Sequence, residues 1–402
     1  MWTRDNDLAR EQLAFDITQS MPWLFDMANF LVCIILIIIL CKKKLLPLWI
    51  GLILSFCSFL PFLLNDFLFP AHYFPDQFGY IAEMANTRAL NFFSINDIPR
   101  EFSKFVWTSY FMSLLPLPYI ETISSLAFYN WFLSILLFAW LYNKKFLSGL
   151  PLLFLLFYPS LILYTSLSLR DPLIVFFMLV GIVFLIEAKY LKFFIATSPL
   201  MILKFQNYFF LLFLLIFFII FRKENSNNFI KTSIFVIIIL CFIPFLNEIL
   251  AQVNFYRYAF FLEDGRPEEL FEPIDGLYNF MIYGITAFPY FLIKPLPWEV
   301  ANSYQLIQSI ENIFVLCFLM VFTKKAYAQS VFITNRWLLY LIFAATVYGL
   351  VIYNFGTAVR YKYPIFISYV VGLSYELYKI KGYKFKPFFK IFKKKPIIFQ
   401  RD

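Results

Sequence analysis

The sequence is poor in charged residues, in glycine and in residues that bind metals. Only 15% of the 402 residues are charged, whereas a soluble globular domain carries roughly 25%. There are 11 glycines, five cysteines and a single histidine, His72. One histidine excludes a multi-histidine metal centre, and the cysteines lie in apolar segments without metal-ligand spacing. We therefore expect no resident metal or other cofactor, and we interpret the cysteines as small core residues.

Long apolar runs dominate the chain instead. Hydrophobic residues make up 61% of the sequence, and the mean hydropathy is +0.73. Windows of about 20 residues almost without charge recur, for example Ile230–Ile249, and such a window is long enough to cross a hydrocarbon core of about 30 Å. The alternation of apolar and polar residues that a β-barrel needs is missing. The sequence thus predicts an all-α, polytopic integral membrane protein.

Clusters of basic residues predict the sides of the membrane. Lys42–Lys44 and Lys144–Lys145 end apolar runs, and the tail 379–402 holds nine Lys or Arg against one Asp, which is +8 of the net charge of +9. By the positive-inside rule these segments lie in the cytoplasm. We expect one transmembrane domain with about eleven helices (range 9–13). The expected spans are Trp23–Cys41, Leu45–Leu64, Thr122–Tyr142, Leu150–Leu167, Leu173–Ile186, Phe193–Leu203, Phe205–Phe221, Ile230–Leu250, Ser303–Phe322, Trp337–Tyr353 and Tyr363–Tyr378.

The remaining segments are expected on the outer side or in the membrane interface. The N-terminal segment 1–22 and two larger periplasmic loops, 65–104 and 251–278, lie outside in this topology. Two further apolar runs, Phe105–Ile120 and Phe280–Ile293, are predicted to be re-entrant or interfacial. The first is short and interrupted by proline, and a full crossing by the second would invert every later span.

The first outer loop holds a candidate for chemistry. Asp76 lies in the segment Pro75-Asp-Gln-Phe-Gly79, four residues after His72. A carboxylate at this place could take the proton from an acceptor hydroxyl. The same pattern also fits Asp76 as the N-cap of a short helix over Phe78–Thr87, and the two interpretations are compatible. We interpret His72 as a loop residue rather than as a base.

With this topology, polar residues at the ends of the spans gather on the outer side. Lys and Arg there run against the positive-inside tendency, and ionisable groups at membrane depth are costly, so they suggest function. A group of cations suits an anionic headgroup such as a lipid-linked diphosphate, because Arg binds phosphate through two hydrogen bonds and Lys as a point charge. Arg360 joins Asp76 as a predicted catalytic residue. The predicted substrate-binding residues are Arg170, Asp171, Lys204, Gln206, Asn207, Lys294, Trp298, Asn354 and Lys362.

Structural explanations exist for several of these residues. Asp171 followed by Pro172 is a common beginning of a helix. Lys204, between two apolar runs, could simply extend its ammonium group to the interface. The acidic segment Glu263–Asp275 could bind a divalent cation through its oxygens, but it lacks the spacing of a calcium loop and also fits a solvated surface.

Several segments together resemble a known group of proteins. They are the Asp76 loop, Tyr158-Pro159 with Arg170-Asp171, Lys294-Pro-Leu-Pro-Trp298, and Asn354-Phe-Gly-Thr-Ala-Val-Arg360 with Pro364. They resemble bacterial polytopic surface-polysaccharide proteins, namely O-antigen-polymerase-like proteins and GT-C-type glycosyltransferases. The resemblance covers most of the chain, from Phe69 to Gly372.

The resemblance implies glycosyl transfer from an undecaprenyl-linked donor at the periplasmic face of a bacterial inner membrane. Asp76 would match the acidic residue of the first outer loop, and Arg360 would match cations that hold the lipid phosphate. The implied partners are lipid-linked sugars, membrane lipids and other polysaccharide-assembly proteins, and nucleic acid is not among them.

The sequence departs from these families at two points, and alternatives stay open. GT-C enzymes usually carry the acidic loop after the first span, whereas here it follows the second, and the nearest second acid is Glu83, seven residues on. Polymerases rely on arginines of outer loops, for which Arg257 and Arg266 are candidates. Polymerase and single-sugar transferase therefore both remain. The alternative from another class is a flippase for lipid-linked oligosaccharides or another transporter, for which an internal repeat would be expected.

Overall fold

The computed structural model describes residues 22–65, 68, 74–90, 103–118, 122–220, 244, 246–263, 267–300, 303–352 and 355–385. Within these residues the elements are helices, with no β-strand among them. In chain order they are α2 (Pro22–Lys42), α3 (Leu48–Cys57), α4 (Leu60–Leu64), α5 (Asp76–Arg88), α6 (Ser103–Ser113), α7 (Ile123–Asn143), α8 (Leu150–Phe157), α9 (Pro159–Thr165), α10 (Asp171–Ile186), α11 (Tyr190–Thr197), α12 (Pro199–Leu203), α13 (Phe205–Ile220), α15 (Leu246–Glu263), the 3₁₀ turn η4 (Glu268–Leu270), α16 (Gly276–Ile293), α17 (Ser303–Tyr327), α18 (Val331–Val351) and α19 (Phe355–Lys381).

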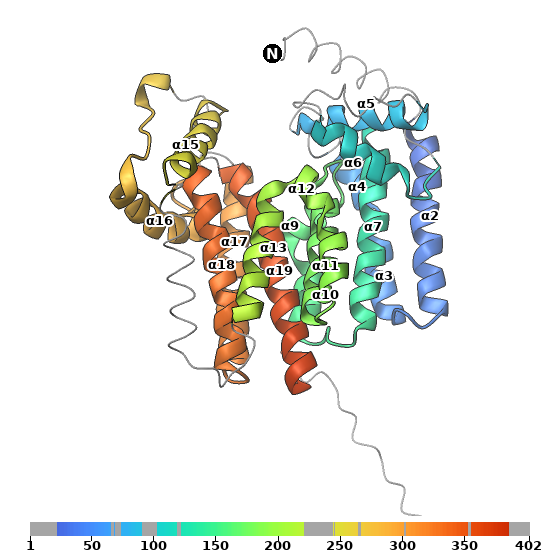
Figure 1. Cartoon of the computed structure of the whole chain (residues 1–402). Coiled ribbons are helices and arrows are strands. Elements are labelled where there is room, and N and C mark those ends of the chain that lie inside the picture. Colours follow the sequence, from blue (N-terminus) through green and yellow to red (C-terminus); the bar gives the residue numbers. More distant parts are fainter. Residues whose placement is uncertain are drawn as a thin grey trace, which may run out of the picture.

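The helices form one bundle whose connections lie at two ends (Figure 1). Among the described residues, four helices are long and apolar enough to cross a membrane, namely α7, α16, α18 and Gln305–Tyr327 of α17. Shorter apolar segments stand beside them at Leu48–Leu64, Asp171–Ile186, Tyr190–Leu203 and Phe205–Ile220. The prediction of an all-helical chain is thereby confirmed for the described residues, and these apolar helices agree with the prediction of a membrane protein.

Lysine-rich connections meet at one end of the bundle, which we call the basic end. Lys144, after α7, forms a 2.7 Å ion pair with Glu187, which follows α10. Glu187 also accepts a 2.7 Å hydrogen bond from the hydroxyl of Tyr375 near the end of α19, and it pairs with Lys189. The amide of Asn143 donates to the carbonyl of Leu45 in the turn after α2. The ends of α2, α7, α10 and α19 are thus held together there.

Several apolar runs that the sequence predicts as single spans are broken into two helices. The run 150–167 divides into α8 and α9 at Tyr158-Pro159, and the run 190–203 divides into α11 and α12 at Ser198-Pro199. Proline has no N–H to donate and disfavours helical conformation in the residue before it; Tyr158 is accordingly extended, whereas Ser198 keeps helical angles. At the first break the N–H of Ser160 donates to the Glu311 carboxylate of α17 at 2.9 Å. A side chain therefore satisfies backbone that would otherwise be unpaired inside the membrane.

The outer loops contain more helix than the sequence predicts. The segment 65–104 contains α5, but Asp76 is its first helical residue and Pro75 holds the N-cap position, so the interpretation of Asp76 as the N-cap is wrong. Helix α6 covers part of the run Phe105–Ile120 and is too short to span the membrane. The first half of the predicted outer loop 251–278 belongs to α15. The run Phe280–Ile293 lies in α16, which extends over 18 residues and has the length and composition of a span, and its re-entrant or interfacial placement stays a prediction.

Helices α5 and α6 lie across the end of the bundle opposite the basic end, which we call the site end (Figure 1). They pack closely because Gly79 has no side chain. A Cβ atom there would lie 2.6 Å from the ring of Phe105 in α6. The same ring meets Tyr80 edge-on, with centroids 4.8 Å apart. This contact brings the first turns of the two helices together.

Helix α19 is the central element, packed against α8, α9, α10, α17 and α18. Near the basic end, Glu376 of α19 is 1% exposed, pairs with Arg336 of α18 and accepts a 2.7 Å hydrogen bond from the indole of Trp337. Gly372 makes room for that indole, since a Cβ atom there would overlap it. These contacts hold the register of α19, and with it the position of its first turns at the site end.

Candidate functional site

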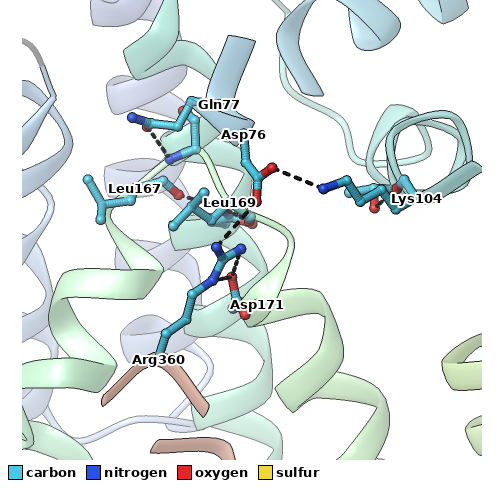
Figure 2. Close-up of polar contacts among 10 residues, drawn as sticks. Asp76, Gln77, Lys104, Leu167, Leu169, Asp171 and Arg360 are labelled. Carbon is cyan, nitrogen blue, oxygen red and sulfur yellow. Dashed lines mark hydrogen bonds and ion pairs between the residues drawn. The ribbon is translucent and has the colours of Figure 1, made fainter. Parts of the chain in front are cut away.

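An ion network at the site end joins four helices (Figure 2). Arg360 of α19 contacts Asp171, the first residue of α10, through Nε and Nη2, each 2.8 Å from Oδ2. Its third nitrogen, Nη1, lies 3.3 Å from Oδ2 of Asp76 in α5. The other oxygen of Asp76 lies 3.0 Å from Nζ of Lys104 in α6. The structure therefore brings the two predicted catalytic residues, Asp76 and Arg360, into contact.

Asp76 is the first residue of α5, and its side chain forms no cap hydrogen bond with the helix. It is directed instead at the two cations. Burial raises the pKa of the Asp76 carboxyl, but Lys104 and Arg360 outweigh burial and lower that pKa from 3.8 to about 2. The carboxylate is therefore ionised throughout the physiological pH range.

The segment between α9 and α10 is irregular, and polar side chains from neighbouring helices hold it in place. The amide of Asn130 in α7 donates to the carbonyls of Leu167 and Leu169 at 2.6 and 2.7 Å. The N–H of Ser168 donates to Oε1 of Gln77 in α5 at 3.1 Å (Figure 2). Irregular backbone at this depth is stable only when protein groups satisfy it. The result is a fixed support for the two residues that follow, Arg170 and Asp171.

Two further cations lie close to the network. Arg170 directly precedes Asp171, and its positive charge lowers the pKa of Asp76. Lys204, between α12 and α13, places Nζ 3.7 Å from the ring centroid of Tyr361. Burial lowers the pKa of Lys204 well below its usual range, and the charge of Arg170 lowers it further. Toward the described residues, neither Arg170 nor Lys204 forms a side-chain hydrogen bond or an ion pair.

The balance of charge favours an anionic ligand. Among the described residues, four cations face two carboxylates, and the two cations that have no carboxylate partner there, Arg170 and Lys204, are both half-buried. Charged groups at membrane depth are costly unless they are paired, so an anion between them would lower that cost. Arginine beside lysine is also the combination that binds phosphate well. We call these six residues the ion cluster; they are Asp76, Lys104, Arg170, Asp171, Lys204 and Arg360.

Two predicted substrate-binding residues flank the ion cluster without joining it. Asn207 in α13 is 3% exposed and accepts a 2.5 Å hydrogen bond from the hydroxyl of Tyr348. Tyr348 in turn stacks on Tyr361, with ring centroids 4.8 Å apart. Asn207 therefore holds Tyr348, and through it the Tyr361 ring on which the Lys204 ammonium lies, instead of facing a ligand. Gln206 is half-buried at the start of α13.

Three other predicted substrate-binding residues have no contact with the ion cluster among the described residues. Lys362 follows Arg360 by two residues, which turns it to the other side of α19. Its Nζ donates to the carbonyls of Leu292 and Lys294, where α16 ends, and the carbonyls at a helix end need such partners. The ammonium group of Lys294 pairs with Glu299. Trp298 is 78% exposed.

Other sequence predictions have structural outcomes as well. His72 and Asn354 lie outside the described residues. Arg257, a candidate for polymerase chemistry, donates to the carbonyl of Leu350 at 2.9 Å and so caps the end of α18. In the acidic segment, Glu268 accepts a 2.5 Å hydrogen bond from the Tyr258 hydroxyl. In the part of the chain that the structure describes, no three His, Cys, Asp or Glu residues gather as metal ligands would.

Sequence reasoning missed Lys104 and Tyr361. Lys104 was considered only as the end of a loop, although it is a single cation at the start of an aromatic run. Tyr361 directly follows Arg360, and nothing in its spacing distinguishes it from the other 25 tyrosines. Both residues matter through contacts with distant segments, which the sequence alone does not show.

Fold and site together define an all-helical membrane protein with a cation-rich ion cluster at the end opposite its lysine-rich connections. No protein-family model, no curated protein and no solved structure matches the chain.

Proposed function

We propose that the protein is a membrane glycosyltransferase or oligosaccharide repeat-unit polymerase that acts on polyprenyl-linked sugars in surface-polysaccharide synthesis. One observation carries the proposal. Arg360 holds Asp76 and Asp171, while Arg170 and Lys204 lie beside them and have no carboxylate partner in the part of the chain that the structure describes. A carboxylate beside several phosphate-binding cations is what transfer from a lipid-linked phosphate to a hydroxyl requires.

We further propose the orientation of the bundle. By the positive-inside rule the basic end faces the cytoplasm, so the ion cluster faces the periplasm of a bacterial inner membrane. In this proposal the described elements that cross the membrane are α2, α3–α4, α7, α8–α9, α10, α11–α12, α13, α17, α18 and α19. The eleventh span that the sequence predicts, Ile230–Leu250, lies mostly outside the described part of the chain, at residues 230–243 and 245.

The proposed reaction is displacement at the anomeric carbon of the donor sugar. A bond forms between that carbon and the acceptor oxygen, and the bond from the carbon to the phosphate oxygen breaks. The hydroxyl proton passes to Asp76, and the electron pair leaves with the phosphate, where Arg170, Lys204 and Arg360 stabilise the charge.

The ion pairs of Asp76 give this reaction a built-in dependence on substrate. With a pKa of about 2, Asp76 is a weak base while Lys104 and Arg360 hold it. A bound phosphate competes with Asp76 for Arg360, and a carboxylate that loses a cationic partner regains a higher pKa. Binding of the anionic donor therefore turns Asp76 into a better base.

Single replacements test the proposal in cells that depend on the protein for surface polysaccharide. Asp76→Asn, Arg170→Gln and Arg360→Lys should each reduce the polysaccharide chain-length ladder on a gel. Trp298→Ala is the matched control, because Trp298 is exposed and lies apart from the ion cluster. Wild-type ladders from all three cluster variants would contradict the proposal.

A second candidate function is transport of lipid-linked oligosaccharides. It is favoured by the helices broken at Pro159 and Pro199, since discontinuous membrane helices often build transport sites. The purified protein in detergent separates the two functions. An enzyme forms a new glycosidic bond there, whereas a flippase has no product once the two sides of the membrane are gone.

A further inference from the structure

An apolar cavity of about 60 Å³ lies inside the bundle, among α3, α7, α8, α9, α10 and α19. Its lining reaches up to Thr165 and Pro172, the residues at the two ends of the irregular segment that presents Arg170 and Asp171. Nearly all of the lining is hydrocarbon. The cavity is thus an apolar space that begins beside the charged site.

The helix registers place the cavity directly below the pair formed by Asp171 and Arg360. On α10, Val175 lines the cavity and follows Asp171 by four residues, so it lies one turn further along the same face. On α19, Ile367 lines the cavity and follows Arg360 by seven residues. Seven residues are two turns, or roughly 10 Å along the axis, on the same face. The ion pair therefore covers the site end of the cavity.

The cavity is closed on one side and open on the other. Val175 and Leu179 of α10 are buried, as is Ile367 of α19. Cys57 of α3 and Ile162 of α9 are only half-buried, although they also line the space. The opening therefore lies between α3 and α9. Leu52 and Phe56 on the same stretch of α3 are 65% and 78% exposed, which is expected of side chains that face lipid.

We propose that this cavity binds the first part of the hydrocarbon chain of a phosphate-bearing lipid whose phosphate occupies the ion cluster. The proposal rests on the proposed function and adds where the chain of the donor lies. Charge complementarity supports it, because the Asp171–Arg360 pair lies at the site end of an apolar space with a lateral opening, and Arg170 next to Asp171 has no carboxylate partner among the described residues.

The size of the cavity limits how much of the chain it holds. About 10–15 Å³ of such cavity volume admits one water-sized group, so the cavity has room for roughly five heavy atoms. That is one short branched segment next to the phosphate. The rest of the chain leaves between α3 and α9 into the bilayer.

Binding measurements on the full-length protein in nanodiscs test this inference. The probes are farnesyl phosphate, dioleoyl phosphatidic acid and inorganic pyrophosphate. Cys57→Phe fills the cavity, and Leu52→Phe adds the same ring to the lipid-facing side of α3 as a matched control. We expect Cys57→Phe to lower the affinity for at least one of the two lipid phosphates by about tenfold or more, since small changes of fit in an apolar pocket have effects of this size. Pyrophosphate affinity should change by less than about twofold in either variant.

The arms of the experiment have distinct meanings. Loss of affinity for farnesyl phosphate alone identifies the bound chain as an isoprenoid. Loss of affinity for phosphatidic acid alone identifies it as an acyl chain of a bilayer lipid. Unchanged pyrophosphate affinity shows that Cys57→Phe is folded. If that affinity also falls, Leu161→Ala replaces the test, since it enlarges the lining and should preserve or strengthen chain binding. Equal affinity of wild type and Cys57→Phe for both lipids would overturn the inference.

Failure of this inference and failure of the proposed function look different. If the wild type transfers sugar but Cys57→Phe has no effect on lipid binding, the inference about the cavity is contradicted and the proposed enzyme function is supported. If lipid binding depends on the hydrocarbon chain but no sugar is transferred, the cavity is supported as a lipid site and the proposed enzyme function is contradicted.

Discussion

Arg360 binds Asp171 through two nitrogen atoms that converge on one carboxylate oxygen, each at 2.8 Å, across 189 residues of chain. This leaves Nη1 directed at Asp76. One planar guanidinium thus fixes the position of α5 relative to α10. A lysine, with a single ammonium group, cannot make this set of contacts.

The first prediction concerns that guanidinium. Asp171 is 4% exposed, so Arg360→Ala leaves a buried carboxylate without its partner. Removing one member of a buried pair costs about 3–5 kcal/mol. We expect a large fall in thermal stability in detergent for Arg360→Ala. The double variant Arg360→Met with Asp171→Leu should regain most of that stability but no activity. Equal stability of the single and double variants would show that the unpaired Asp171 carboxylate is not the cause of the lost thermal stability.

The second prediction uses the pH dependence of phosphate binding. Because burial and Arg170 lower the pKa of Lys204, raising the pH removes its proton earlier than in an ordinary lysine. Pyrophosphate favours the protonated form, so its affinity should fall as pH rises through the lowered pKa. Lys204→Arg stays charged and should abolish this fall, whereas Lys204→Met should bind weakly at every pH. Calorimetric titration from pH 6 to pH 10 measures both effects, and identical profiles for Lys204→Arg and wild type would exclude the role of Lys204.

A glycine supplies the third prediction. In Gly79→Ala the new Cβ would lie 2.6 Å from the ring of Phe105, so α6 must move away from α5. Lys104 precedes Phe105 and would be drawn from Asp76. We expect a several-fold loss of phosphate affinity in a folded protein. Gly284→Ala is the control, because its Cβ would meet only Thr346 at an ordinary 3.7 Å. Unchanged affinity in Gly79→Ala would mean that the spacing of α5 and α6 does not matter.

The fourth prediction follows from the lowered pKa of Asp76. Its folded-state pKa is about 2 against a usual value of 3.8, so the unfolded chain takes up the proton first as pH falls. The stabilisation is complete above about pH 4 and is lost as pH falls toward 2. Amide hydrogen exchange of α5 should accelerate over that window in wild type, and Asp76→Asn should show no such step. A local readout is needed because Glu187, at the basic end, has a pKa lowered to about 2 as well.

Part of this structure was predictable from sequence. Apolar runs and lysine-rich turns predict a helical bundle with two unlike ends, because hydrocarbon and membrane charge asymmetry act on composition alone. The same reasoning grouped Asp76 with Arg360, since both were expected at the outer ends of their segments. It failed for Lys362, whose place is set by the unpaired carbonyls at the end of α16, a feature of the folded chain.

The most direct test of the central claim is glycosyl transfer by the purified protein. Radiolabelled lipid-linked sugars extracted from the producing cells serve as donor and acceptor, and wild type, Trp298→Ala and Asp76→Asn are compared in nanodiscs. We predict a new lipid-linked product with wild type and with Trp298→Ala. Asp76→Asn should slow its formation by about 10²–10⁴-fold, the contribution typical of a general base. Transfer by Asp76→Asn at the wild-type rate would contradict the account.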